Sequence, residues 1–283
     1  MRCFQPDIKY LEQIKRLCCI CFNMEADEVN YVFEHNYIST EICYAIEDSG
    51  ELCCMLFTVP CTMIYNGKFI QGHYIYGACT LPEYRHRGLM HKLICYTSAQ
   101  RKDRGDCFSV LLPANDSLYS FYATMGYIPA YKAVNKYIDR QSLPDLMEDI
   151  KYKHNFSVSY MHCIRNQVCR SFTGTIAYSQ RILEYALHYA KECGGGAVQC
   201  DYGYIIYAYD DSGSLFVLEL MCLPQHKNIM LGILKNIADT PKIMLRQPPW
   251  LHNTDDHFGM IKILSNKLNT EAFKQAYLGL TFD

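Results

Sequence analysis

Two long apolar runs joined by Asn66-Gly67 constrain the fold of this chain more than any other feature. The runs cover residues 52–64 and 69–80. Asn and Gly both tolerate the positive φ angles of a two-residue turn, so the segment predicts a hairpin of two antiparallel strands. Gly72 and Gly77 in the second run predict a bulge or a close approach of another backbone. The fold must therefore contain a sheet built on this hairpin.

Helical and extended patterns alternate on both sides of the hairpin. Helices are predicted within residues 1–40, over about 88–102, and over 116–125, where Gly126 ends the last one. Strands are predicted at residues 42–46, 108–112 and 127–138. Strands and helices in this order are typical of an α/β fold, here of the α+β kind with a mixed sheet.

The second half of the chain repeats this order in a weaker form. It predicts a hairpin over residues 204–222, a helix over 228–238 and a strand over 242–246. Leu223-Pro224-Gln225 echoes Leu81-Pro82-Glu83, and the charged segment 139–156 interrupts the pattern. We therefore expect two related domains, residues 1–140 and 141–283, each a mixed sheet flanked by helices.

Composition excludes several classes of protein. Half of the 283 residues are apolar and a fifth are charged, which predicts a folded chain. The net charge of -2 argues against a general binder of nucleic acids or anionic membranes. We see no signal-peptide core and no apolar run near the roughly 20 residues that span a bilayer, so we expect a cytoplasmic protein.

The chain contains 16 cysteines. Many lie in apolar runs, such as residues 53–57 and 220–223, where a thiol behaves as a small hydrophobic group. Cys18 and Cys21 form a lone C-x-x-C without a second pair at zinc-finger spacing. We expect reduced core thiols and no metal, with redox or metal use of this pair as the less favoured alternative.

A basic loop, residues 82–89, separates the hairpin from the helix that follows it. The first turn of a helix offers unpaired N–H groups and the positive end of its dipole. Gly88 allows close approach to the backbone, and Arg85 and Arg87 add charge and bidentate geometry. The loop therefore predicts a phosphate site, although a solvated charged turn explains it equally well by itself. The corresponding loop after Pro224 has neither the paired arginines nor the glycine.

A second group of polar residues follows the strand at 108–112. Asn115 can bond local backbone or a ligand at the start of a helix. Tyr119 and Tyr122, three residues apart, share one face of that helix. Taken alone, this tyrosine pair is more typical of core packing than of catalysis.

Together, the loop 82–89 and the N-x6-Y-x3-G-Y spacing from Asn115 to Tyr127 resemble the two signatures of the GNAT acyl-CoA N-acyltransferases. The resemblance is close over residues 69–127 and extends over roughly the first 140. Met90 departs from it, because the family prefers Gly or Ala there, which implies a tighter fit at the pyrophosphate. The tandem order and the closing run 275–283 are similar to enhanced-intracellular-survival-type acetyltransferases, whose sterol-carrier-like domain we expect this chain to lack.

The resemblance implies that acetyl-CoA donates its acetyl group to a primary amine of a small molecule or peptide, by direct attack in a ternary complex. It implies that strand backbone pairs with the pantetheine arm, that loop N–H groups hold the pyrophosphate, and that Tyr122 protonates the CoA thiolate. The implied cofactor-binding residues are Ala78, Cys79, Thr80, Arg85, His86, Arg87, Gly88, Leu89, Met90 and Asn115. His73 and the terminal carboxylate of Asp283 are weak candidates for the base, and His73 is equally well explained as a core histidine.

Other functions stay open at this point. A non-catalytic acyl-CoA-binding or regulatory protein would keep the loop without turnover. A tandem-domain interaction protein would not bind CoA. We expect the second domain to be a degenerate GNAT-like unit that serves as scaffold or acceptor lid, and the sequence leaves open a homo-oligomer. Tyr31 and Tyr37 fit either an aromatic acceptor cleft or ordinary packing.

Overall fold

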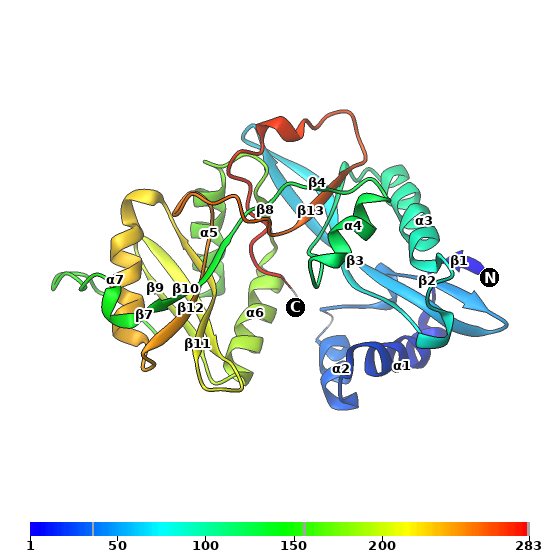
Figure 1. The fold of residues 1–283 in the computed structure, drawn as a ribbon, viewed down its shortest axis with the longest axis horizontal. Coiled ribbons are helices and arrows are strands. Elements are labelled where there is room, and N and C mark those ends of the chain that lie inside the picture. Colours follow the sequence, from blue (N-terminus) through cyan, green and yellow to red (C-terminus); the bar gives the residue numbers. More distant parts are fainter. Residues whose placement is uncertain (36, 155–156, 282–283) are drawn as a thin grey trace.

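The computed structural model describes residues 1–35, 37–154 and 157–281, which form two lobes, each built on a mixed sheet (Figure 1). Asp283, a candidate base, lies outside the described residues. The structure confirms the predicted α/β class with two mixed sheets flanked by helices.

The first sheet has eight strands in the order β1-β2-β3-β4-β5-β13-β6, with β8 also paired to β3. Its strands are β1 (Arg2–Phe4), β2 (Cys43–Asp48), β3 (Glu51–Tyr65), β4 (Lys68–Thr80), β5 (Phe108–Leu111), β6 (Ile128–Pro129), β8 (Ile176–Ala177) and β13 (Met260–Ile263). Only β4 and β5 run parallel among these described pairs. The parallel pair is where a crossover helix is required, and α3 (Leu89–Asp103) supplies it.

The hairpin β3–β4 confirms the turn and both glycine predictions. Asn66 and Gly67 have φ angles of 49° and 75°. Gly77 has a φ of 57° and lies where two residues of β4 face one residue of β3, which is a β-bulge. At Gly72 a Cβ would lie 2.6 Å from Phe108, so the glycine permits close packing of β5 on β4.

Helices cover both faces of the first sheet (Figure 1). On one face, α1 (Leu11–Phe22) and α2 (Ala26–Glu34) bury Ile14, Leu17 and Val29 against β3 and β4. On the other face, α3 and the short α4 (Ser117–Ala123) pack against β4 and β5. Cysteines fill much of this core as small apolar side chains, as predicted, and all sixteen are free thiols within the described residues.

The second sheet has the order β7-β12-β11-β10-β9. Its strands are β7 (Val134–Asp139), β9 (Gly196–Cys200), β10 (Gly203–Tyr209), β11 (Leu215–Cys222) and β12 (Lys242–Gln247), and its helices are α5 (Val158–Cys169), α6 (Gln180–Glu192) and α7 (Lys227–Ile237). The order β11, Pro224 turn, α7, parallel β12 repeats the order β4, Pro82 turn, α3, parallel β5. The predicted echo between Pro82 and Pro224 is thus present in the backbone.

The two sheets do not follow the division expected near residue 140. Strand β7, which precedes that position, pairs with β12 of the second sheet. Strand β13, near the end of the chain, pairs with β5 and β6 of the first sheet. Each sheet thus contains a strand from the other half of the sequence, and the two-domain division stays a prediction.

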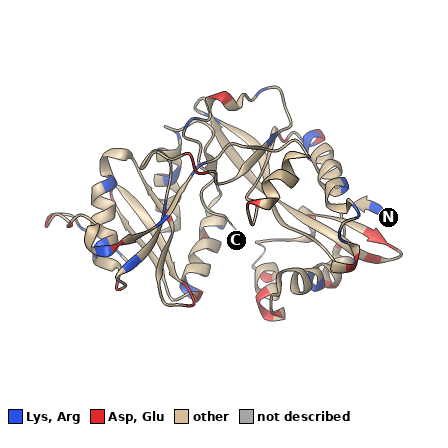
Figure 2. Cartoon of the chain, in the orientation of Figure 1, with Lys and Arg blue, Asp and Glu red and all other residues tan. Residues whose placement is uncertain are grey.

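Charged residues of both signs are spread over both lobes (Figure 2). Among the described helices, none is long and apolar enough to cross a bilayer.

Candidate active site

The edges of β4 and β5 separate soon after the strands meet. Only two parallel pairs join them, His73 with Ser109 and Tyr74 with Val110. Beyond these pairs β4 continues to Thr80 with its other edge still bonded to β3, whereas β5 ends at Leu111. The edge of β4 over residues 75–80 therefore faces an opening in the sheet. An extended ligand can add to such an edge through backbone hydrogen bonds.

The loop that follows β4 exposes a row of backbone donors. Gly88 caps the start of α3 with a left-handed φ of 71°, and His86 also has a positive φ of 63°. The N–H groups of residues 86–91 donate to no acceptor in the described parts of the chain. A Cβ on Gly88 would meet no atom within 4 Å, so the space in front of these N–H groups is open. This geometry suits a diphosphate at a helix N-terminus.

The two arginines of the loop have a use that the sequence did not predict. Arg85 Nε donates to the Thr80 carbonyl at 3.1 Å, and Arg87 Nη2 donates to the Glu83 carbonyl at 2.7 Å. The Arg87 guanidinium also lies over the Tyr84 ring, 5.0 Å from its centre. Both side chains thus brace the loop conformation, while their exposed N–H groups add positive charge beside the backbone donors.

Tyr122 lies on α4, next to the opening. Its ring packs in one buried cluster with Ile75 of β4 and Leu89 and Leu93 of α3. Its hydroxyl has no hydrogen-bond partner among the described residues, and burial raises its pKa to about 12. Tyr122 is 8% exposed, and a hydroxyl without a protein partner on such a side chain is free to meet a ligand.

The other polar residues of this helix have structural roles. The Tyr119 hydroxyl accepts a hydrogen bond from the Gly259 N–H at 3.3 Å. Asn115 Oδ1 accepts from Ser117 Oγ at 2.6 Å, and its carbonyl accepts from the Leu118 N–H. Asn115 therefore organises the start of α4, one of the two uses that its position predicts.

The structure places His73 in the core rather than at the opening. Its ring is fully buried, and Nδ1 lies 2.7 Å from Asp106 Oδ2. Arg101 Nε donates to the same oxygen at 2.8 Å, and Gln71 Nε2 donates to the other carboxylate oxygen. The sequence offers His73 as a candidate for the base, with a hydrogen-bonded core histidine as the alternative. The observed burial and hydrogen bond agree with the core histidine. Burial makes a charged ring costly there.

The buried His73 predicts a pH dependence of stability. Burial lowers the pKa of His73 in the folded chain below the ordinary 6.5. At a pH between the lowered pKa and 6.5, this histidine is therefore protonated only in the unfolded chain. The contribution of His73 to the free energy of unfolding should be constant above pH 6.5 and fall as the pH drops below it. Urea unfolding between about pH 5 and 8 should show this slope, and His73→Gln should flatten it. The exposed His257, changed to Gln, should leave the slope intact; an unchanged slope in His73→Gln would contradict the argument.

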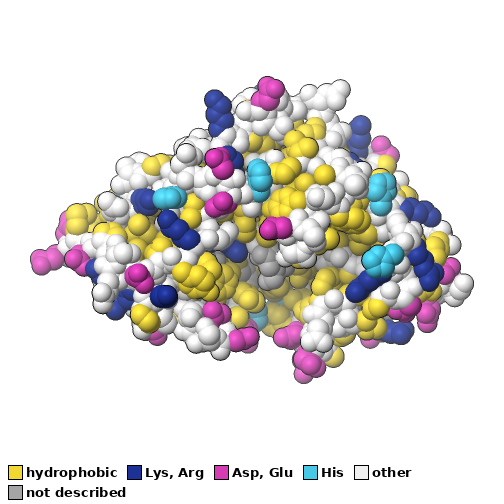
Figure 3. All heavy atoms as spheres, in the orientation of Figure 1, with side chains coloured by type: hydrophobic (Ala, Val, Ile, Leu, Met, Phe, Trp, Pro, Cys, Tyr) yellow, Lys and Arg dark blue, Asp and Glu magenta, His cyan; other side chains and the backbone are white. Residues whose placement is uncertain are grey.

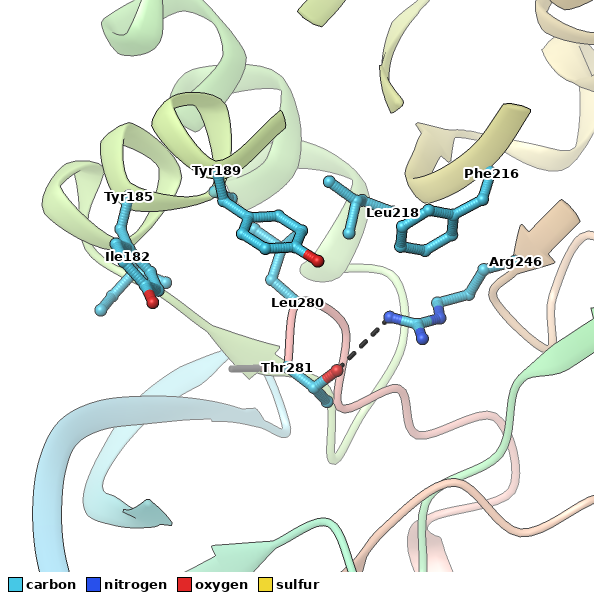
Figure 4. Close-up of a pocket in the computed structure, with 9 residues that line it drawn as sticks. Ile182, Tyr185, Tyr189, Phe216, Leu218, Arg246, Leu280 and Thr281 are labelled. Carbon is cyan, nitrogen blue, oxygen red and sulfur yellow. Dashed lines mark hydrogen bonds between the residues drawn. The ribbon is translucent and has the colours of Figure 1, made fainter. Parts of the chain in front are cut away.

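A pocket of about 100 Å³ lies between α6, β11, β12 and the closing segment, residues 275–281 (Figure 4). Tyr189 and Phe216 contribute rings, and Arg246 donates to Thr281 Oγ1 at 3.3 Å. Tyr185 on its wall hydrogen-bonds Tyr76 of β4, so the pocket borders the first sheet. Sequence patterns did not predict it, because its residues come from four separate segments.

Aromatic rings join the lobes beside this pocket. Tyr31 stacks on His188 of α6 at 4.0 Å between ring centres, and Tyr37 lies 4.6 Å from Tyr185. Figure 3 shows the molecular face hollowed between the lobes, with hydrophobic side chains around the hollow. Tyr31 and Tyr37 therefore make contacts between the lobes, and neither is ordinary core within one lobe.

The second lobe differs from the first at the corresponding positions. The carbonyl of Cys222, at the end of β11, accepts a hydrogen bond from Trp250 Nε1 at 3.0 Å, where the first lobe has Thr80 and Arg85. Trp250 is buried and stacks on Phe172, with 4.1 Å between ring centres. The first turn of α7 contains no glycine.

Comparison with known proteins agrees with this geometry. Residues 6–130 match the model of the acetyltransferase (GNAT) domain. No curated protein matches the chain.

Solved structures of similar fold cover 93% of this chain. One is a GCN5-related N-acetyltransferase from Anabaena variabilis, with a TM-score of 0.77, 16% sequence identity and 73% of that chain covered. Another is a GCN5-related N-acetyltransferase from Kribbella flavida, with a TM-score of 0.72, 15% identity and 72% of that chain covered. Eis1 from Mycobacterium abscessus is also similar, with a TM-score of 0.70, 14% sequence identity and 74% of that chain covered. At these identities the likeness establishes the fold, which extends across both lobes.

Proposed function

We propose that this protein is an acetyl-CoA-dependent N-acetyltransferase that acts on a primary amine of a small molecule or peptide. The observation that carries the proposal is one juxtaposition. The open edge of β4, the unpaired N–H groups of residues 86–91 and the unpartnered Tyr122 hydroxyl surround the same gap in the sheet. The match of residues 6–130 to the GNAT domain supports the reaction class.

In this proposal the chain binds acetyl-CoA at two places. The pantetheine arm adds to β4 beside residues 78–80 through backbone hydrogen bonds. The pyrophosphate accepts hydrogen bonds from the loop N–H groups in front of Gly88. These contacts direct the thioester into the gap next to Tyr122.

The amine attacks the thioester carbonyl carbon, and the carbon–sulfur bond then breaks to release the CoA thiolate. Tyr122 is the hydrogen-bond donor to that sulfur. With a pKa of about 12 against about 8.5 for a thiol, complete proton transfer is uphill by about 5 kcal/mol. We therefore propose that the hydrogen bond stabilises the developing thiolate and that protonation is completed late.

The amine must also lose a proton. In this proposal His73, which is buried against Asp106, does not take that proton. A water chain or a carboxylate of Asp283 takes the proton in this proposal. The closing segment brings Thr281 to the wall of the pocket formed by α6, β11 and β12, which is the side from which we propose that the acceptor enters.

Release of CoA from acetyl-CoA, measured with polyamines, amino sugars and lysine peptides as acceptors, tests the function. Calorimetry with CoA alone separates the alternatives. Binding together with turnover supports the enzyme. Binding without turnover on any amine would favour an acyl-CoA-binding or regulatory protein, and absence of binding would overturn both.

Gly88→Val should weaken CoA binding by at least about tenfold, because a Cβ and its methyl groups would fill the open space before the N–H groups. The matched control is Gly105→Val at the other end of α3. Gly105 also has a positive φ, of 98°, and also faces open space, so it carries similar backbone strain without contacting the proposed ligand. Calorimetry should find CoA binding retained in the control; equal losses in both variants would contradict the assignment.

A further inference from the structure

The pocket of about 100 Å³ beside the closing segment is lined mostly by apolar side chains. Its residues on α6 follow helical spacing and those on β11 follow strand spacing, so each element turns one apolar face toward the same space. These faces and the closing segment contribute Ile182, Ala186, Tyr189, Phe216, Leu218 and Leu280. Among the described residues that line the pocket, Arg246 of β12 is the one that carries a charge. A ligand for this pocket therefore needs an apolar body and one group that suits a guanidinium.

The guanidinium of Arg246 has hydrogen-bond donors to spare. Nε donates to Asn135 Oδ1 at 3.0 Å, and Nη1 donates to Thr281 Oγ1 at 3.3 Å. The group also lies over the Phe258 ring, 4.7 Å from its centre. These contacts fix its plane and leave Nη2 without an acceptor in the described parts of the chain. Figure 4 shows the guanidinium reaching into the pocket beside Thr281.

The charge of Arg246 also lacks a carboxylate partner among the described residues, although the side chain is half-buried. The buried Arg165 is paired with Glu219. The half-buried Arg101 is paired with Asp106. Because a cation removed from water is costly unless an anion offsets its charge, Arg246 is suited to an anion that enters with a ligand.

The pocket lies a short way along the closing segment from the gap at the end of β5. A Cβ on Gly259 would lie 2.7 Å from the Leu278 side chain and 3.3 Å from the carbonyl oxygen of Leu111, the last residue of β5. Leu278 is thus beside the strand end where the gap opens. Thr281, on the pocket wall, follows three residues later, and three residues span at most about 11 Å. A molecule with about nine bonds between its ends covers the same distance.

We propose that the amine acceptor carries a carboxylate, joined to its amine by an apolar segment, and that Arg246 binds this carboxylate. The inference rests on the proposed function and narrows the acceptor to one chemical class. The apolar segment packs against α6 and β11, while the carboxylate oxygens accept from the Nη groups of the guanidinium. One carboxylate balances the single charge of Arg246, whereas a phosphate would bring nearly two negative charges into an otherwise apolar pocket.

Acetylation of 8-aminooctanoate and of 8-aminooctanamide tests the proposal, because the two acceptors differ in the charge at the end away from the amine. With the full-length protein we expect kcat/KM to favour the acid by at least about tenfold, as for hydrogen bonds to a charged group. Arg246→Gln should remove this preference by raising KM for the acid, and Arg246→Lys should restore part of it. The matched control is Arg170→Gln, since Arg170 also lies over a ring, 5.4 Å from the centre of Phe69, but does not line the pocket.

The ratio between the two acceptors separates carboxylate binding from a merely structural role of Arg246. Loss of the contact with Thr281 would slow the acid and the amide alike and would leave their ratio unchanged. Equal kcat/KM for the two acceptors in the wild type would overturn the proposal. A preference for the acid that survives in Arg246→Gln would overturn it as well.

Calorimetry with octanoate, which has no amine, gives a second readout that needs no turnover. We expect octanoate to bind the wild type and Arg170→Gln, and to bind Arg246→Gln at least about tenfold more weakly. If no amine is acetylated, the proposed function fails, while octanoate still decides whether Arg246 binds a carboxylate. Equal binding to the wild type and Arg246→Gln, or binding to neither, would contradict the assignment.

Discussion

Replacement of Tyr122 by Phe is expected to lower kcat at least about a hundredfold and to leave KM for acetyl-CoA nearly unchanged. The change removes only the hydroxyl oxygen, so the ring should keep its packing in the buried cluster with Ile75 and Leu89. The hydroxyl has no partner among the described residues, so its loss leaves no protein group unpaired. The loss should therefore appear in the step that releases the CoA thiolate.

Tyr119→Phe is the matched control, since Tyr119 lies one turn earlier on the same helix and its hydroxyl bonds the Gly259 backbone. Its kcat should stay close to that of the wild type. Steady-state kinetics and thermal unfolding of both variants would check the comparison. A Tyr122→Phe enzyme with wild-type kcat would remove this residue from the proposed mechanism.

The pKa of Tyr122 also predicts the alkaline side of the pH profile. Burial raises it to about 12, so the hydroxyl should stay protonated throughout the range in which the protein is assayed. The kcat profile should therefore show no alkaline decline from Tyr122 below about pH 10.

The second large effect is expected on stability. Glu219→Leu should lower the free energy of unfolding by about 3–5 kcal/mol, because it leaves the guanidinium of Arg165 buried without its charge partner. Both side chains are fully buried, and the Tyr204 hydroxyl also donates to the carboxylate. Urea unfolding would measure the loss.

The same pair joins several segments of the chain. Arg165 Nη1 donates to the Ile176 carbonyl in β8 at 2.6 Å, and the Ile176 N–H donates to the Tyr277 carbonyl of the closing segment. At Gly279 a Cβ would overlap the Arg165 side chain. We therefore expect the closing segment to pack less tightly when Glu219→Leu removes the charge partner of Arg165.

Two comparisons separate charge burial from loss of packing. The double variant Arg165→Met with Glu219→Leu should recover most of the lost stability, because no uncompensated charge remains. Asp255→Asn breaks an exposed ion pair with Lys132, 2.8 Å long, and should leave the unfolding midpoint unchanged. If Glu219→Leu and the double variant were equally unstable, packing rather than charge would explain the loss.

Local signals predicted the parts of the site that depend on neighbours in sequence. The positive φ at Asn66 and Gly67 follows from residue types that tolerate it, and the structure has both. The Pro82 and Pro224 turns likewise follow their strands in both lobes. Met90 is half-buried beside the cluster that contains Tyr122, and its effect on the pyrophosphate stays a prediction.

Other features needed the folded chain. Sequence spacing could not separate Tyr122 from Tyr119, since both share a helix face, and only the position of Gly259 shows which hydroxyl is engaged. The burial of His73 depends on Asp106 and Arg101, which follow it by 33 and 28 residues. Nothing in the short segment 260–263 indicates that it inserts beside β5.

The sequence by itself determined the hairpin, the glycine-capped helix after it and the alternation of strands with helices, because these depend on φ preferences and on apolar spacing within a few residues. The tertiary structure alone decided how β7 and β13 cross between lobes and which tyrosine hydroxyl stays unengaged. These depend on burial and on contacts between distant segments. Such contacts form only when the whole chain packs, so no local pattern encodes them.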